Sequence, residues 1–303
     1  MSLHLILCSR AILRVAFALG AVLALASGCS RQEIPGASAD AERRFPLTGL
    51  VLAVDGPRKL LRVQHDEIKG LMPAMTMEFV VAEGDLAVAR EGHRIRAILV
   101  QRGGDFALEA LWPDDPEITR AVVAGSAALK QDTVIRGSKA YREVGETVPD
   151  FTLLDQAGQV VQINRYRGKQ VVLNFIYSRC PIPTMCPAAT AHMVALQQAA
   201  RAAGIANLEL VSVTLDPSYD TPGVLREYAA ARGIDLANFS LLTGPEPAIR
   251  DLLTQMGVIA QFDGALIKHS LATVLINAEG KIVWREDGSA WDPAVFLQRM
   301  RKN

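Results

Sequence analysis

Residues 171–187, VVLNFIYSRCPIPTMCP, decide the fold of the larger part of this chain. The first seven are mostly apolar and β-favouring, so they predict a buried strand over 171–177. A short loop that contains two prolines follows, and the residues beyond it predict a helix over 187–202. Cys180 and Cys186 therefore lie where a buried strand passes into a helix.

The same alternation of strand and helix continues to the end of the chain. Further strands are predicted at 208–215, 272–277 and 281–286, and helices at 222–232, 245–256 and 293–300. Apolar strands that alternate with helices predict a mostly buried sheet with helices on both faces. The last two strands are joined by a glycine turn and are expected to be antiparallel. A thioredoxin-like α/β domain is therefore predicted over 144–303.

Residues 46–113 have a different pattern. Short β-favouring runs are separated by turn signals such as Asp55-Gly56-Pro57 and Gly103-Gly104. A segment of this length suits a small all-β, OB-like barrel of about five antiparallel strands. Residues 114–143 show weak periodicity and are expected to form a connector with some helix.

The first 28 residues have the features of an export signal. Arg10 and Arg14 precede an apolar run over 15–28, and no acidic residue accompanies them. The run is too short to span a bilayer but matches the core of a signal peptide. We therefore expect the bulk of the chain to lie outside the cytoplasm.

Residues 25–30, LASGCS, resemble the lipobox of bacterial lipoproteins. The resemblance implies that Cys29 is lipidated and becomes the mature N-terminus. The alternatives are cleavage near Ala26 and an uncleaved anchor. The polar residues 29–45 would then form a flexible tether on the periplasmic side of a membrane in the cell envelope of a bacterium.

The composition excludes several classes of protein. The 303 residues include 32 basic and 32 acidic side chains and four cysteines. Half of all the residues are hydrophobic (50%). A disordered polymer, a disulfide-dense miniprotein and a polytopic membrane protein are excluded. Balanced charge argues against nucleic acid as a partner. With Cys8 in the signal and Cys29 lipidated, Cys180 and Cys186 remain as a free thiol pair in an oxidising compartment.

Four side chains of the barrel segment form the first candidate metal site. Met75 and Met77 share one face of a predicted strand, and Met72 and His65 lie shortly before them. Thioethers with one imidazole suit Cu(I) and are poor ligands for Zn²⁺, Mg²⁺ or Ca²⁺. Thioethers also survive where free thiols are oxidised. The alternative is that the methionines fill the barrel core.

The segment 65–81, HDEIKGLMPAMTMEFVV, resembles the copper-binding motif of small periplasmic copper chaperones, the CusF-like family. The resemblance covers about 46–113 and implies a five-stranded barrel that binds copper through His65, Met75 and Met77. These chaperones commonly have a Trp that shields the metal where this chain has Met72. Met72 is therefore either an added ligand or the mark of a more open site.

Cys180, Cys186 and His269 form the second candidate site. A helix N-terminus stabilises thiolate, so the pKa of Cys186 is expected to be lowered, as suits a metal ligand or a redox nucleophile. His269 precedes the strand 272–277, at a junction that faces the cysteine loop in a thioredoxin-like sheet. Two thiolates and one imidazole accept both Cu(I) and Cu(II). The alternative is that these residues are structural.

The last 160 or so residues resemble the Sco/SenC family of copper-binding thioredoxin-like proteins. The resemblance is carried by VPDFTLLDQAGQ (148–159), NFIYSRC (174–180) with the second Cys-Pro, VTLDP (213–217), DTP (220–222) and His269-Ser270. It implies copper delivery to the CuA centre of cytochrome c oxidase, or thiol reduction of that centre. Family members usually space the cysteines C-x3-C, whereas this chain has C-x5-C with Met185 inside. The spacing leaves open whether the protein is a chaperone or a reductase. Met185 could serve as an additional weak ligand.

Four other polar residues are not assigned to a site. His192 is predicted on the surface, pointing away from the thiols, and His93 is predicted in a solvated turn. Asp216 and Asp220 stand beside prolines and are interpreted as turn and helix-cap residues.

Together these features predict a lipid-anchored extracytoplasmic copper metallochaperone. The methionine set would capture Cu(I), and the cysteine set would hold copper for a recipient such as subunit II of cytochrome c oxidase. A second hypothesis is an enzyme, a thiol:disulfide oxidoreductase that cycles Cys180 and Cys186. Against it, Ala272 stands where thioredoxins have a cis-proline. A copper-resistance buffer is the third hypothesis.

Overall fold

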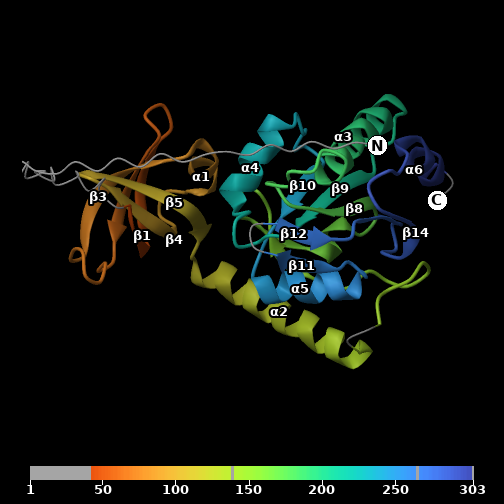
Figure 1. Ribbon diagram of the computed structural model, residues 1–303, viewed down its shortest axis with the longest axis horizontal. Coiled ribbons are helices and arrows are strands. Elements are labelled where there is room, and N and C mark those ends of the chain that lie inside the picture. The colour runs from red at the N-terminus through yellow and green to blue at the C-terminus, as the bar shows by residue number, and fades with distance from the viewer. Residues whose placement is uncertain (1–41, 138–139, 264–265, 302–303) are drawn as a thin grey trace, which may run out of the picture. The chain divides into compact units, whose positions relative to one another are not determined.

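The computed structural model describes residues 42–137, 140–263 and 266–301 (Figure 1). The predicted signal peptide 1–28, the predicted lipidation site Cys29 and nearly all of the predicted tether lie outside these residues. Within the described part of the chain, no helix combines the length and hydropathy needed to cross a membrane.

The first five strands close into a barrel in the order β1-β2-β3-β5-β4. They are β1 (Arg43–Asp55), β2 (Leu60–His65), β3 (Met75–Val81), β4 (Arg94–Arg102) and β5 (Asp105–Pro113), with the short helix α1 (Glu83–Val88) between β3 and β4. The predicted five-stranded barrel is confirmed. The expectation that all its pairs are antiparallel is wrong, because β3 and β5 are parallel. An odd number of strands cannot alternate in direction all the way round a closed barrel.

Strand alternation fills the inside of the barrel. Along β2, Leu61, Val63 and His65 are buried and the residues between them are exposed. A Cβ at Gly49 would lie 2.7 Å from the carbonyl oxygen of Gln64, so β1 crosses β2 at a separation that glycine permits. His65 is therefore a polar residue at the end of an otherwise apolar inner face.

The second sheet has the order β10-β9-β8-β13-β14 and forms a thioredoxin-like domain. Its strands are β10 (Phe239–Leu242), β9 (Leu208–Thr214), β8 (Gln170–Ile176), β13 (Ala272–Ile276) and β14 (Ile282–Asp287). The first three are parallel, whereas β13 is antiparallel to both β8 and β14. The predicted α/β class and the antiparallel final pair are thus confirmed. The sequence patterns did not reveal β10, which is only four residues long.

Helices cover both faces of this sheet (Figure 1). The helices are α2 (Pro116–Arg136), α3 (Cys186–Ala202), α4 (Pro222–Ala231), α5 (Glu246–Gln255) and α6 (Pro293–Met300). The crossovers through α3 and α4 run in the same direction along the sheet, which places both helices on one face. α5 returns the chain in the other direction and covers the opposite face, where it packs against α2. Two hairpins, β6 (Thr152–Leu154) with β7 (Val160–Gln162) and β11 (Ala260–Asp263) with β12 (Leu266–His269), and one 3-10 turn, Ile163–Tyr166, complete the domain.

The sheet brings the second candidate site together at one edge. β8 is buried along its whole length and ends at Ile176, just before the cysteine loop. Because β13 runs antiparallel to β8, with Thr273 opposite Asn174, the residues that precede β13 lie at the edge where β8 ends. His269 is thereby placed beside the cysteines, although more than 80 residues separate them in the sequence.

Candidate metal sites

Cys180, Cys186 and His269 converge in the thioredoxin-like domain. The two sulfurs and one ring nitrogen of the histidine all lie within 4.8 Å of one another, and Cys186 Sγ is 3.6 Å from His269 Nε2. Both cysteines are free thiols. In the described part of the chain, this is the one group of three or more Cys, His, Asp or Glu side chains whose geometry could hold a metal ion. The C-x5-C spacing therefore does not keep the two thiols apart.

The cysteine loop is held by its own backbone and by a distant segment. The N–H of Cys180 donates to the carbonyl of Tyr177 (3.3 Å), and the N–H of Met185 donates to the carbonyl of Ile182 (3.0 Å). Ser289 Oγ donates to the carbonyl of Thr184 (2.6 Å). These bonds hold the backbone on both sides of the exposed residues 181–184.

The expectation that the pKa of Cys186 is lowered is wrong. Its side chain is fully buried, and burial raises the pKa because it disfavours the thiolate. The N–H groups of Tyr177 and of Cys186 itself oppose this rise, and the Cys180 thiol adds to it. The position at the start of α3 does not outweigh complete burial. A bound cation would reverse the balance, since metal coordination favours the thiolate.

His269 is poised to bind a metal through Nε2. Its Nδ1–H donates to the carbonyl of Ser270 (3.1 Å), which leaves the lone pair of Nε2 facing Cys186. Burial lowers the pKa of His269, and the hydrogen bond to Ser270 only partly offsets the shift. The imidazole is therefore favoured in the neutral form, which is the form that coordinates metals.

Tyr177 is a member of the site that the sequence patterns did not reveal. Its ring meets the His269 ring edge to face, with centroids 5.3 Å apart. Burial raises the pKa of its phenol to about 12, and the Cys180 thiol adds to the rise. Tyr177 thus packs directly against the imidazole of His269.

Two buried aspartates hold the start of the cysteine loop by hydrogen bonds. The carboxylate of Asp220 accepts hydrogen bonds from the N–H of Ser178 (3.1 Å), the hydroxyl of Ser178 and the hydroxyl of Thr214 (2.5 Å). Asp216 accepts from Arg179 Nε (2.7 Å). The two residues that precede Cys180 are therefore both tied to the edge of the sheet. The turn interpretation is confirmed for Asp216, whose Oδ1 also accepts a hydrogen bond from the hydroxyl of Ser218 (2.8 Å), but the sequence patterns did not reveal that both aspartates hold the cysteine loop.

Thr221, not either aspartate, caps α4, because its hydroxyl accepts a hydrogen bond from the N–H of Val224 (3.3 Å). Asp216 and Asp220 are fully buried. A usable signal was present in the sequence: both acids follow a buried strand whose end lies at the same sheet edge as the cysteines. Buried carboxylates need partners, and the loop supplies them.

The barrel holds the first candidate site at one end of its inner face. His65 on β2 is directly opposite Met75 on β3, and Met77 is opposite Val63. His65 is only 1% exposed, and its Nδ1–H donates to the carbonyl of Asp66 (2.8 Å). Its Nε2 is buried and has no hydrogen-bond partner within the described residues. A buried ring nitrogen without a partner, beside thioethers, fits a soft metal ion.

The exposure of the inward-facing side chains falls along β3, from Met75 at its start toward Phe79. Met75 is 44% exposed, Met77 is partly buried, and Phe79 on the same face is completely buried. Met72 lies in the turn before β3, where its backbone bridges to Ile68, and its side chain is partly buried against the barrel core. A hollow of about 480 Å³ opens beside His65 and Met75. The end of the barrel that carries Met75 is thus accessible to solvent, whereas Phe79 on the same face belongs to the barrel core.

The other two histidines of the described residues take no part in either group. His192 is partly buried, with its ring 5.3 Å from that of Trp291, so the prediction of a surface position was wrong. α6 follows Trp291 and packs on α3, which covers this face of the helix. His93 is exposed as predicted, and its Nδ1 contacts Asp115 (2.8 Å).

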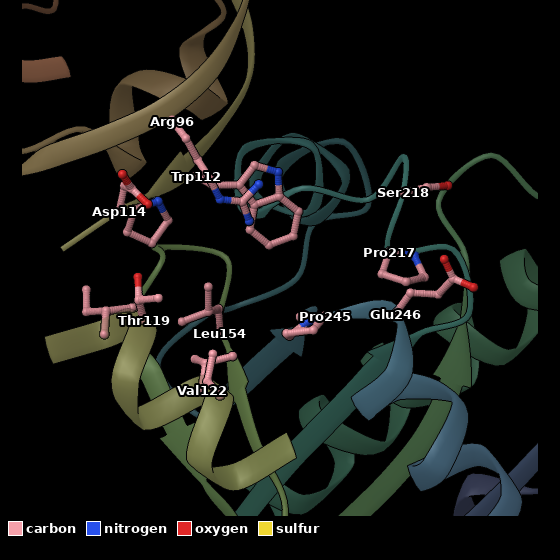
Figure 2. Close-up of a pocket in the computed structure, with 14 residues that line it drawn as sticks. Arg96, Trp112, Asp114, Thr119, Val122, Leu154, Pro217, Ser218, Pro245 and Glu246 are labelled. Carbon is pink, nitrogen blue, oxygen red and sulfur yellow. The ribbon is translucent and has the colours of Figure 1, made fainter. Parts of the chain in front are cut away.

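The pocket drawn in Figure 2 has a different character, with a volume of about 450 Å³. Its walls include Trp112, Val122, Leu154 and Pro245, and the guanidinium of Arg96 lies over the Trp112 ring at 4.8 Å. Neither a thiol, a thioether nor an imidazole lines it. It therefore offers no ligands for a soft metal.

Comparison with known families agrees with the two groups of donors. The model of the family described as SCO1/SenC matches residues 139–302, which is more than half of the chain. The chain belongs to the SCO1/SenC family. Residues 44–113 match a second model, described as copper binding periplasmic protein CusF. The two matches support copper as the metal, and they coincide with the thioredoxin-like domain and the barrel.

Individual SCO relatives match about half of the chain or more. The chain is 29% identical over 140 residues to the SCO1 protein homolog of Bacillus subtilis, which covers 45% of this chain and 71% of that protein. It is 31% identical over 193 residues to the SCO2-like protein of Rickettsia felis, covering 61% of this chain and 83% of that protein.

Among solved structures, the chain is similar to a SCO1/SenC family lipoprotein from Bacillus anthracis, with 24% identity and a TM-score of 0.48. That match covers 54% of this chain and 98% of the other. It is also similar to yeast Sco1 with copper bound, with 21% identity, a TM-score of 0.45 and coverage of 52% and 88%.

Proposed function

We propose that this protein is a membrane-anchored extracytoplasmic copper metallochaperone of the SCO1/SenC family. The barrel would capture Cu(I) through His65, Met75 and Met77, with Met72 at its edge. The thioredoxin-like domain would hold copper for delivery to the CuA centre on subunit II of cytochrome c oxidase. Lipidation of Cys29 would keep the protein at the membrane that holds its recipient.

The convergence of Cys180, Cys186 and His269 carries this proposal. Two thiols and one imidazole nitrogen within 4.8 Å form a set that can ligate Cu(I) and Cu(II) without a large rearrangement. His269 presents a free lone pair, and each thiol can become a thiolate when copper arrives. A chaperone needs such a site, because its cargo must enter and leave again.

The barrel supports the proposal through an independent set of ligands. Thioethers bind Cu(I) without releasing a proton, whereas thiols must lose theirs. Copper can therefore be captured at the methionine end whatever the redox state of the cysteines. Two soft-metal sites in one chain suit a protein that collects copper at one site and presents it at another.

The test is copper stoichiometry on the reduced chain from residue 30, measured without oxygen, beside the Cys180→Ala/Cys186→Ala variant. We expect two Cu(I) per chain in the parent and one in the variant. The remaining copper should be lost when Met75 and Met77 are also replaced by Ala. A parent chain that binds no copper would overturn the proposal.

A thiol:disulfide oxidoreductase is the second candidate, favoured by two free thiols held close together. Cys180 and Cys186 would then give two electrons and two protons to a disulfide partner and form a disulfide themselves. Ala272, where thioredoxins have a cis-proline, removes a clamp for the partner's peptide. Rapid cycling of a disulfide together with weak copper binding would favour this candidate.

A copper-resistance buffer uses the same two sites without a recipient. Transfer of copper from the loaded protein to a soluble CuA domain distinguishes the two roles. A chaperone should load the domain faster than free copper does, and a buffer should withhold the metal.

A further inference from the structure

A tight seam joins the barrel to the thioredoxin-like domain where α1 meets α4. A Cβ at Gly84 would overlap the carbonyl group of Gly223, and a Cβ at Gly223 would overlap the carboxyl group of Asp85. The N–H of Gly84 crosses the seam to donate to Glu227 Oε1 (3.0 Å). Two glycines in register allow the two backbones to approach this closely.

A buried carboxyl group lies in this seam. Asp85 is 6% exposed, and its Oδ1 has no hydrogen-bond partner within the described residues. Its carboxyl group accepts one hydrogen bond, from the N–H of Leu111. That N–H is not used in the pairing of β5 with β4, because Ala110 and Leu111 form a β-bulge on β5, with Ala110 at a φ of 53°.

The charged groups around Asp85 do not neutralise it. Glu227 on α4 and Glu109 on β5 both oppose its ionisation. Glu83 on α1 pairs with Lys59 (3.4 Å). Lys59 and Arg226 line a hollow at the exposed side of the seam, beside Glu83 and Glu227. An ionised Asp85 would therefore be a buried charge among other carboxylates.

We propose that this seam is a reversible docking surface, on which α1 of the barrel seats against α4 when Asp85 is protonated and is released when Asp85 ionises. The partner on this surface is the protein's own barrel. Separation exposes Asp85 to water, where its carboxylate needs no protein partner. Docking therefore takes up one proton, and release returns it to solvent.

The sign of the pH dependence follows from burial. Burial raises the pKa of Asp85 to about 7 in the docked state, from an ordinary value of 3.8, and Glu227 adds to the rise. Docking is therefore favoured at low pH and weakens as the pH rises above 3.8, the ordinary pKa of an aspartate. Above about pH 7 the carboxyl group is ionised in both states, so docking weakens no further.

The place of the seam links it to copper transfer. Gly223 lies in the first turn of α4, and Thr221 and Asp220 precede that turn. Asp220 is the residue that holds Ser178 beside the cysteine loop. The barrel thus docks on the helix that directly follows Asp220, so its release would free the Cu(I)-capturing domain to move relative to the cysteine site.

Amide hydrogen exchange at Gly84, followed by NMR in the chain from residue 30, tests the proposal. This amide is protected by Glu227 only when the seam is closed. After correction for intrinsic exchange, we expect its protection to fall about tenfold or more between about pH 5.5 and 8. In Asp85→Asn, protection should be similar at both values, because Asn cannot ionise.

Two further variants complete the experiment. Asp105→Asn removes an exposed carboxylate of the barrel and should behave as the parent does. Gly223→Ala should leave Gly84 unprotected at both pH values while the β1 and β4 amides stay protected, which shows that the barrel is folded. Glu227 is intact in Asp85→Asn, so a pH effect that does not depend on Asp85 remains visible there. Equal protection of the parent at both pH values, or the same fall in Asp85→Asn, would overturn the proposal.

Discussion

At the scale of single residues, the two candidate histidine ligands are oriented by the same kind of hydrogen bond. His65 and His269 each donate Nδ1–H to a backbone carbonyl of the next residue, which leaves Nε2 as the free ligand atom. The cysteines differ in this respect, because the thiol of Cys186 is fully buried and its pKa is raised. The imidazoles are ready for a metal, whereas Cys186 must first lose a proton.

Copper binding at the cysteine site should therefore release protons. Because burial keeps Cys186 protonated, Cu(I) must displace at least that proton, and the apparent affinity should rise about tenfold per pH unit for each proton displaced. Proton release can be measured in weakly buffered solution during titration with Cu(I). The Met75→Ala/Met77→Ala variant isolates the cysteine site. Affinity that is independent of pH between about 6 and 8 would contradict a protonated Cys186.

His269 should discriminate between the two oxidation states. His269→Ala is expected to weaken Cu(II) binding and to spare Cu(I), since two thiolates satisfy Cu(I) and Cu(II) needs the imidazole. Cys180→Ala should abolish Cu(II) binding in this domain. Both effects are visible in the thiolate-to-copper absorption band. A full band in the Cys180 variant would refute its role as a ligand.

At the scale of elements, the cysteine loop depends on the ends of two strands. β8 leads into Ser178, and β9 leads to Thr214 and Asp220, whose side chains hold the start of the loop. These bonds lie at the edge of a buried parallel pair, so they are shielded from water. The loop is therefore fixed by buried hydrogen bonds and not by its sequence alone.

Replacement of Asp220 by Asn should test this support. An amide NH₂ cannot accept the hydrogen bonds that the carboxylate accepts, so buried donors lose their partners. We expect Asp220→Asn to lower the free energy of unfolding by about 2–4 kcal/mol and to broaden the Cu(II) band. Asp287→Asn, at the exposed end of β14, should change stability by less than about 0.5 kcal/mol. Equal stability of the two variants in urea would refute the supporting role.

At the scale of the whole molecule, the two candidate sites belong to separate cores. The barrel core includes Val63 and Phe79, whereas the core of the thioredoxin-like domain includes Phe175 and Val213. Met75 is half exposed at the end of its strand, so it contributes little to the barrel core. Each site should therefore be removable without loss of the other.

Met75→Ala with Met77→Ala should reduce Cu(I) binding at the barrel and leave one Cu(I) at the cysteine site. The free energy of unfolding should change by no more than about 2 kcal/mol, because Met75 is half exposed and Met77 is only partly buried. Copper titration and thermal unfolding of the same sample check both parts. A collapse of stability would favour methionines that serve as core filler.

The sequence by itself determined the two fold classes and the chemistry of the donors. Strand and helix periodicity is local, and the softness of thioethers and thiols belongs to the residues themselves. The elements over 171–202 and the shared strand face of Met75 and Met77 follow from such local rules. The resemblance of the cysteine loop and of 65–81 to known families added the expected sites.

Only the tertiary structure decided how the environment modifies these residues. The raised pKa of Cys186, the partial burial of His192 and the two hydrogen bonds from Ser178 to Asp220 all arise from segments distant in sequence. The parallel pair of β3 and β5 arises from closure of a barrel with five strands. Burial and closure are properties of the packed chain, and a local pattern carries no information about which segment will cover it.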